Sequence, residues 1–190
     1  MPVLELQGRH LSWVNTIKYL GIVFTLGFIM QADLSDRARK FQCAVCAILR
    51  NKLSGYETVY TELIIKKCMP ILFYGLGVFN LNAHMVNVLS HVWNMAFRFI
   101  YGLRKYDSTR LVLQSSPTMS LKFLFDERML LFLDSLKQCN NVLVCNLWHW
   151  VHMREWYVRL LAKYSMYGVE SRKVISSNVH NMFADYCDEI

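Results

Sequence analysis

The chain has 190 residues, of which 54% are hydrophobic, and its formal net charge is +7. This composition excludes intrinsic disorder and supplies enough apolar surface for the core of one domain, or of a domain with an appendage. The positive charge suits a polyanionic partner. It is concentrated between 9 and 110, with 13 basic and 5 acidic residues, whereas the chain from 120 onward has 8 of each.

Three strand-like runs open the chain. Two of them, at 3–8 and 10–14, are separated by a break after a glycine, which predicts a hairpin. The third, IKYLGIVF at 17–24, is rich in β-branched and aromatic residues and nearly free of charge. That pattern predicts a short strand buried on both faces. Strand signals largely stop after this run, so a small β element introduces a mostly helical chain.

Apolar residues at helical spacing predict an amphipathic helix with a basic face from 34 to about 53. Asp33 is its expected N-cap, and Asp36 in the first turn favours the positive end of the helix dipole. Glu57 opens a second helix. Pro70 should kink or stop this second helix, because proline donates no backbone hydrogen bond and its ring clashes with the preceding turn.

Further helices are predicted along the rest of the chain. Asn82 can cap a third helix, with Gly102 as its stop and a polar connector beyond it. A fourth helix should begin after Ser120, and a fifth, rich in large aromatic residues, should run from about 142 to 164. The tail from Glu170 is polar enough to fray.

Three segments of the chain carry motifs in a fixed order. The first is a hairpin, then Lys-Tyr-Leu-Gly-Ile, then a long helix; the second is KKCMPILFYGLGVF at 66–79, followed by HVWNMAFRFIYGL at 91–103; the third is a Leu-x-x-x-Arg helix at 116–133. This order resembles that of reverse transcriptases of non-LTR retrotransposons, over roughly 1–140. The first segment resembles the end of the palm and the start of the thumb, where the Tyr-Leu-Gly strand acts as a primer grip. The second resembles the thumb segment with its cysteine, proline and Tyr-Gly, and the third is a weaker match to a C-terminal helix.

The resemblance implies a polymerase fragment without its catalytic centre. Enzymes of this family hold two magnesium ions with a pair of adjacent aspartates and a third aspartate from an earlier strand. No two aspartates of this chain are adjacent, and the family's pair would precede the Tyr-Leu-Gly strand. We therefore expect a fragment that begins after the catalytic centre, with no cofactor of its own and no polymerase activity.

The candidate binding residues follow from the resemblance and from the charge pattern. The resemblance implies a primer-grip-like role for Lys18, Tyr19, Leu20 and Gly21, whereas the residues alone favour a buried strand whose glycine allows close packing. Nine other cations could contact the phosphates of a template-primer, but they could equally be ordinary solvated side chains. They are Arg37, Arg39, Lys40, Arg50, Lys52, Lys66, Lys67, Arg104 and Lys105. Arg110 is ambiguous in the same way.

The cysteines and aromatic residues allow more than one interpretation. Cys43 and Cys46 could form half of a zinc site, but the distant candidates depart from the family's Cys-Cys-His-Cys spacing, so core thiols are favoured. Those candidates are Cys139, Cys145, His149 and His152. An aromatic set could stack on single-stranded bases, or belong to the core or to a partner surface. Its members are Trp148, Trp150, Trp156, Tyr157, Tyr164 and Tyr167.

The sequence predicts an α+β fold, mainly α, with a short antiparallel β element and a helical thumb-like bundle. The expected parts are a palm remnant at 1–30, a thumb-like region at 31–110 and a helical extension at 111–190. The expected function is that of a non-catalytic reverse-transcriptase fragment that binds RNA or an RNA-DNA duplex.

Two other functions compete with this one. The first is a helical module that binds a protein partner through the aromatic C-terminal helix. The second is a small membrane protein, but Pro, Gly, Asn and His interrupt the uncharged stretch between Lys67 and Arg98, which argues against a membrane span. The first residues contain no apolar leader, so an intracellular site, cytoplasm or nucleus, is expected.

Overall fold

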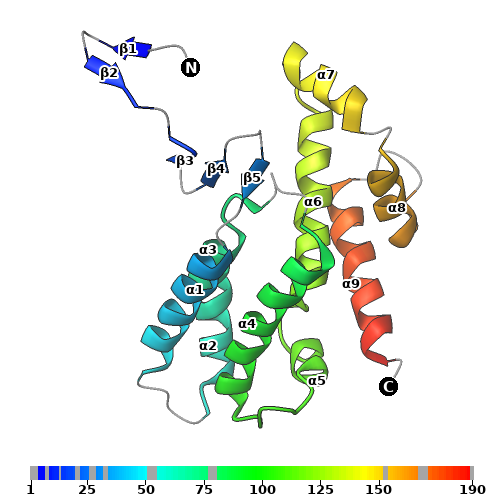
Figure 1. Cartoon of the computed structure of the whole chain (residues 1–190). Helices are drawn as coiled ribbons and strands as arrows, with labels where there is room; N and C mark the ends of the chain where they lie inside the picture. The colour runs from blue at the N-terminus through cyan, green and yellow to red at the C-terminus, as the bar shows by residue number, and fades with distance from the viewer. Residues whose placement is uncertain are drawn as a thin grey trace.

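A computed structural model describes most of the chain. The described residues are 4–6, 9–12, 14–19, 22–25, 29–31, 34–50, 55–76, 81–151, 154–166 and 171–188. Within these ranges the chain is mainly helical, and the strands are short and confined to the N-terminal end (Figure 1). The prediction of a mainly α chain is therefore confirmed.

The described strands pair in two antiparallel sheets. β1 (Leu4–Leu6) pairs with β2 (Arg9–Leu11), and β4 (Ile22–Thr25) lies between β3 (Thr16–Tyr19) and β5 (Ile29–Gln31). In Figure 1, β1 and β2 lie apart from the helices, whereas β5 lies above the start of the first helix. The helices therefore provide most of the packing in the molecule.

The prediction of one buried strand over 17–24 is wrong. Ile17 is the partner of Phe24 and Tyr19 is the partner of Ile22, so β3 and β4 are the two arms of a hairpin. All four residues of β3 are exposed, and Ile17 keeps 58% of its surface. A run of β-forming residues with a central glycine is compatible with either arrangement, and here the chain reverses instead of continuing.

The helices follow in a single series. They are α1 (Leu34–Leu49), α2 (Glu57–Leu63), α3 (Met69–Phe73), α4 (Ala83–Tyr101), α5 (Arg110–Gln114), α6 (Leu121–Lys137), α7 (Val142–Val151), α8 (Glu155–Lys163) and α9 (Arg172–Asp188). α1 packs against α3 and α4, α4 also packs against α6, and α9 packs along α6 (Figure 1). In the described part of the chain, no helix has the length and apolar character needed to cross a bilayer.

The ends of α4 lie where the sequence predicts them. The Asn82 side chain accepts a hydrogen bond from the backbone nitrogen of Met85 at 2.8 Å, which satisfies a donor that the first turn leaves without a helical partner. Gly102 follows the helix with φ of 64°, a left-handed conformation that glycine adopts without a steric penalty. Both local signals therefore determine the length of α4.

The second predicted helix does not stop at Pro70. It continues to Phe73 through a five-residue π turn, η1 (Ile64–Cys68), which joins α2 to α3. The wider turn lies immediately before the proline, where the regular ladder would lack a donor and the ring would crowd the preceding turn. The irregular turn therefore accommodates Pro70 within a continuous helical segment.

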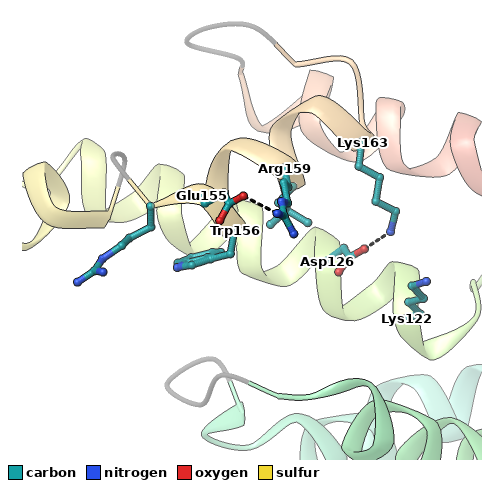
Figure 2. Close-up of a pocket in the computed structure, with 8 residues that line it drawn as sticks. Lys122, Asp126, Glu155, Trp156, Arg159 and Lys163 are labelled. Carbon is teal, nitrogen blue, oxygen red and sulfur yellow. Dashed lines mark hydrogen bonds and ion pairs between the residues drawn. The ribbon is translucent and has the colours of Figure 1, made fainter.

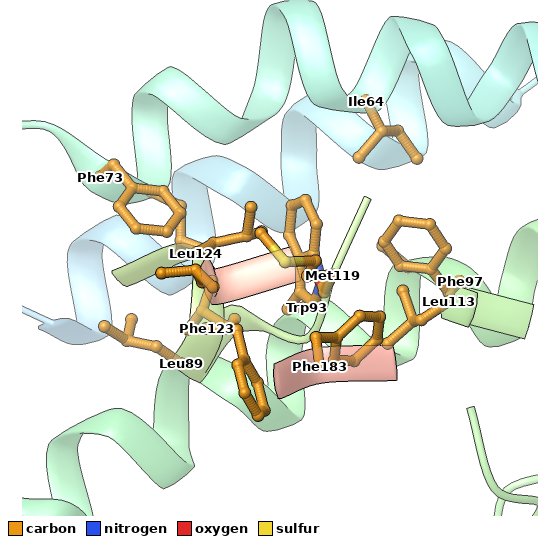
Figure 3. Packing of buried hydrophobic residues seen from close by; sticks show 14 of the residues in the cluster. Ile64, Phe73, Leu89, Trp93, Phe97, Leu113, Met119, Phe123, Leu124 and Phe183 are labelled. Atoms are coloured by element: carbon orange, nitrogen blue, oxygen red, sulfur yellow. The ribbon is translucent and has the colours of Figure 1, made fainter. Parts of the chain in front are cut away.

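Trp93 lies at the centre of the buried core (Figure 3). It is fully buried, and its Nε1 donates a hydrogen bond to the backbone oxygen of Met119 at 3.2 Å. Its ring lies 5.1 Å from that of Phe97 and 6.0 Å from that of Phe41. The same cluster of buried residues extends to Cys187, so side chains from both sides of the predicted boundary at 110 belong to one core.

The polar tail does not fray as predicted, because it forms α9. Ile175, Val179, Phe183 and Cys187 are buried at intervals of four residues. This spacing gives a narrow apolar stripe on one side of a helix, and the stripe faces α6 and α5. The prediction of fraying rested on the overall polarity of the tail, to which these four buried residues contribute little.

One other prediction about helices is also wrong. The fifth predicted helix is divided into α7 and α8, and residues 152–153 between them lie outside the described part. The polar connector predicted after Gly102 is non-helical at 103–109, and α5 begins at its last residue, Arg110.

Candidate nucleic-acid interface

The primer-grip-like segment lies on the exposed hairpin. Lys18 and Tyr19 of β3 both face solvent, and Tyr19 keeps 63% of its surface. Leu20 and Gly21 lie outside the described residues. The alternative prediction, a buried strand, is therefore wrong for Lys18 and Tyr19. Both side chains are accessible to a large ligand.

Two candidate cations lie beside one carboxylate in the first turns of α1. Arg39 and Lys40 contact the carboxylate of Asp36 at 2.8 and 2.6 Å. The hydrogen bond from Lys40, and then the one from Arg39, lower the pKa of Asp36 to about 2, so this carboxylate stays ionised. Arg39 and Lys40 remain 75% and 57% exposed. This group presents a net charge of one positive unit to solvent.

Arg37 does not lie on the basic face, and its assignment as a phosphate-contacting residue is corrected. Only 6% of its surface is exposed, and its guanidinium carbon lies 5.9 Å from the centre of the Tyr74 ring. Residue 37 shares a side of α1 with the buried Phe41 and Val45, at intervals of four residues. Its position on the helix, and not its charge, decides its environment.

The remaining candidate cations lie on several elements. On η1, Lys66 donates to Glu62 at 2.7 Å and thereby lowers the pKa of that carboxyl, whereas Lys67 is simply exposed. Arg50 is exposed after α1, and Lys52 lies outside the described residues. The nearby carboxylate offsets part of the charge on η1.

Three candidates follow α4 in the chain. Arg104 and Lys105 are exposed in the connector between α4 and α5, and Lys105 lies 5.4 Å from the ring of Tyr106. Arg110 instead contacts α9, where its guanidinium stacks on the Tyr186 ring at 4.0 Å. Arg110 therefore helps to hold α9 in place.

The structure brings some of these residues together and separates others. α1 and η1 pack against each other, so Arg39, Lys40, Lys66 and Lys67 lie on neighbouring elements. The α4–α5 connector lies at the bottom of Figure 1, at the opposite end of the helices from β3, β4 and β5. The predicted binding residues therefore form separate groups and not one continuous patch.

A second basic site, which the sequence did not predict, lies between α6 and α8. It is a hollow of about 590 Å³ (Figure 2). The residues that line it are Lys122, Asp126, Arg154, Glu155, Trp156, Arg159, Leu160 and Lys163. Four cations and two carboxylates thus surround one tryptophan.

Both carboxylates of this hollow already have cationic partners. Glu155 pairs with Arg159 one turn along α8, and Asp126 of α6 pairs with Lys163 at the end of α8. The Tyr164 hydroxyl also donates to Asp126 at 2.6 Å. Burial, and then the bond to Asp126, raise the pKa of Tyr164 far above its usual value, so the hydroxyl stays protonated. These bonds join the end of α8 to α6.

The cysteine interpretation is partly wrong. Cys43 and Cys46 lie on α1 but both are exposed, so they are not core thiols, and Cys145 is exposed as well. Among the described residues, no three His, Cys, Asp or Glu side chains lie close enough to hold a metal ion. Cys68 does belong to the core, and burial raises the pKa of its thiol to about 11.

The predicted aromatic set is divided between core and surface. Tyr164 is buried, Trp150 and Trp156 are 68% and 43% exposed, and Tyr167 lies outside the described residues. Trp148 and Tyr157 pack edge to face at 5.5 Å. The sequence signal for the hollow was the set of cations interleaved with these aromatic residues.

Comparisons of the chain with protein-family models, with curated proteins and with solved structures find no match. The likeness to reverse transcriptases therefore rests on the motifs quoted above. What the chain does is inferred from those motifs together with the charges and surfaces just described.

Proposed function

We propose that the chain is a non-catalytic fragment of a non-LTR retrotransposon reverse transcriptase, and that it binds RNA or an RNA-DNA duplex through backbone phosphates. The observation that carries the proposal is the order of three motifs in the sequence, at 17–24, 66–79 and 116–133. Each motif is short, and their succession within one chain is what gives them weight. The absence of adjacent aspartates supports the non-catalytic part.

Several structural features are compatible with this role. The exposed Lys18 and Tyr19 project from a hairpin, so a duplex has access to them. Arg39, Lys40 and Lys67 are exposed on helices that pack together. No base-reading motif accompanies these cations, so we expect weak binding that is tolerant of sequence.

The electrostatic test uses salt. Each lysine that contacts a phosphate of a duplex releases condensed counterions, so the logarithm of the binding constant should fall with the logarithm of salt by about 0.9 per contact. We would measure fluorescence anisotropy of a labelled RNA-DNA hybrid at several salt concentrations. Lys18→Gln and Lys67→Gln should each weaken binding and reduce this slope by about one.

Lys173→Gln on α9 is the matched control, because Lys173 is exposed and has not been assigned to the interface. Its affinity and slope should equal those of the unmodified chain. An unmodified chain that does not bind the hybrid, or a salt slope unchanged by both interface variants, would overturn the proposal. Incorporation of nucleotides in the presence of magnesium would overturn its non-catalytic part.

The origin of the chain has a separate test in the nucleotide sequence upstream of Met1. Translation in all frames should encode a strand, a turn with adjacent aspartates and a second strand. An unrelated and non-coding upstream region would remove the main support for a polymerase origin. This test does not depend on whether the isolated chain binds nucleic acid.

A helical protein-binding module is the second candidate function, and the exposed apolar residues of the C-terminal helices favour it. Val142, Leu143 and Trp150 on α7 keep between 68% and 73% of their surface, and Val158 on α8 keeps 55%. Exposed apolar groups of this kind often mark binding surfaces. Self-association that does not change with salt, measured by sedimentation equilibrium, would favour this function over nucleic-acid binding.

A further inference from the structure

The hollow between α6 and α8 has cations at both of its ends. Lys122 and Lys163 lie near Asp126 at one end (Figure 2). Arg154 also lines the hollow and immediately precedes the first residue of α8. Arg154 and Lys163 are nine residues apart in sequence, which corresponds to about 13 Å of helix at 1.5 Å per residue. An elongated anion can therefore meet positive charge at both ends of this hollow.

The hollow has more positively charged than negatively charged side chains. Four cations line it against two carboxylates, and each carboxylate pairs with one of the cations, namely Arg159 or Lys163. Lys122 and Arg154 remain, and neither forms an ion pair with a carboxylate of the described residues. The chain from 120 onward is balanced overall, so these two cations set the hollow apart from its surroundings.

Aromatic surface lies beside these cations. Trp156 lines the hollow and keeps 43% of its surface. At the rim, the Arg154 guanidinium lies 4.7 Å from the Trp150 ring, in a cation–π contact. Exposed aromatic rings among backbone-contacting cations are the arrangement that proteins use to bind unpaired bases.

We propose that this hollow binds a short single-stranded segment of RNA or DNA. Trp156 stacks on one base, Arg154 contacts a phosphate at one end, and Lys122 with Lys163 contacts phosphates at the other. A length of 13 Å corresponds to about three or four nucleotides at the 3.4 Å spacing of a stacked strand. This site is separate from the proposed duplex interface and does not depend on it.

The shape of the site favours a single strand over a duplex. A hollow of about 590 Å³ has room for a small segment, whereas a duplex presents its phosphates outward and keeps its bases paired. Trp156 can stack on a base only when that base is unpaired. The tryptophan therefore supplies the preference for single strands, and the cations supply general affinity.

The site is held in place before any ligand arrives. Asp126 on α6 accepts hydrogen bonds from Lys163 and from the buried Tyr164, both at the end of α8. Leu160 and Leu161 on α8 pack partly against the core. Because these contacts fix the end of α8, little ordering entropy is lost when a strand binds.

The test compares three labelled probes with the full chain by fluorescence anisotropy. The probes are an oligouridylate of about eight nucleotides, a blunt-ended RNA duplex without a loop, and an acidic peptide of eight glutamates. The oligouridylate should bind more tightly to the hollow than the other two probes. Equal or tighter binding of the acidic peptide, with the same sensitivity to substitutions in the hollow, would overturn the proposal.

Substitutions locate the site. Trp156→Ala should weaken oligouridylate binding roughly tenfold, the scale of one lost stacking contact. Lys122→Gln and Arg154→Gln should each weaken it severalfold and reduce the salt slope by about 0.7, the value for a single strand. Two matched controls should leave affinity unchanged: Val158→Ala, an exposed apolar residue of α8 outside the hollow, and Lys173→Gln on α9.

A spectroscopic readout separates stacking from a structural effect. Bound oligouridylate should quench the fluorescence of the unmodified chain, because a stacked base quenches the indole. Trp156→Phe should keep most of the affinity, since phenylalanine also stacks, but should lose this quenching. Unchanged quenching in Trp156→Phe, or unchanged affinity in Trp156→Ala, would overturn the proposal.

The two proposed sites can fail independently. Lys67→Gln should weaken binding of the RNA-DNA hybrid and leave the oligouridylate unaffected, whereas Lys122→Gln should do the reverse. If both variants weaken both probes equally, one shared surface binds all nucleic acid and the separate site in the hollow is overturned. If the oligouridylate binds the unmodified chain but the hybrid does not, the proposed single-strand site is supported and the proposed duplex interface is overturned.

Discussion

α8 and α9 both lie beside α6, and they differ in a way that their sequences do not suggest. α8 separates its apolar and polar residues sharply, yet none of its described side chains is buried. α9 is mostly polar and separates them weakly, yet it buries four residues, from Ile175 to Cys187. The more amphipathic of the two helices is thus the more exposed.

The difference shows that a helix face becomes buried only where a neighbour covers it. α9 lies along α6, and Phe183 packs against Phe123 of α6 at 5.3 Å. α8 is held mainly through its end, where Lys163 and Tyr164 contact Asp126. The side chains of α8 are therefore available to line a hollow, whereas those of α9 stabilise the fold.

The largest expected effect comes from removing one buried ring on α9, which tests the difference in burial between α9 and α8. Phe183→Ala should lower the free energy of unfolding by about 3–5 kcal/mol, because it removes a core ring and leaves a cavity. Trp156→Ala on α8 should lower it by less than about 0.5 kcal/mol, as is usual at exposed sites. Urea unfolding followed by circular dichroism measures both. Similar losses in the two variants would contradict the contrast.

The attachment of α8 predicts a smaller effect. Tyr164→Phe removes the hydroxyl that donates to Asp126 at 2.6 Å, and it should cost about 1–2 kcal/mol of stability. The control is Tyr106→Phe, because Tyr106 is 87% exposed and should tolerate the change. Thermal unfolding of the two variants gives the comparison. A loss no larger than that of the control would show that this bond does not hold α8.

The reactivity of two thiols tests the burial of α9 without any substitution. Cys187 on α9 is buried, and burial raises its pKa, so the reactive thiolate is scarce. Cys145 on α7 is exposed. In a short pulse of iodoacetamide, read by peptide mass spectrometry, Cys187 should react at least about tenfold more slowly. Equal rates would mean that the end of α9 opens readily.

The smallest expected effect comes from the ion pair on α8. Glu155 and Arg159 form an exposed pair one turn apart, with 77% and 76% of their side chains accessible. Glu155→Gln should therefore lower the free energy of unfolding by only a few tenths of a kcal/mol. A loss above about 1 kcal/mol in urea unfolding would show that α8 contributes more to the fold than its exposure indicates.

Local chemistry was the most predictable part of this fold. Asn82 and Gly102 define the ends of α4, since a cap and a left-handed glycine act within a few residues of themselves. Helix content as a whole was also predictable from apolar spacing. The π turn before Pro70 was not, because a proline at this position is compatible with a stop, a kink or a wider turn.

Exposure of individual residues was the least predictable part. Arg37 is buried although it is charged, and Cys43 and Cys46 are exposed although cysteine is usually buried. Each environment depends on which side of α1 meets its neighbours. The hollow was missed for the same reason, because Lys122 joins the α8 cations only when α6 and α8 come together.

The π turn from Ile64 to Cys68 also limits how this chain can change in length. Such a turn contains one residue more than an ordinary helical turn of the same rise. Deleting a single residue there would restore a regular helix and leave the side chains before and after it on the faces they now occupy, so Leu72 and Phe73 would stay in the core. Deleting a residue from a regular part of the same segment would instead rotate one side by about 100° relative to the other. A one-residue deletion should accordingly be tolerated better at this turn than in the regular helices of this fold.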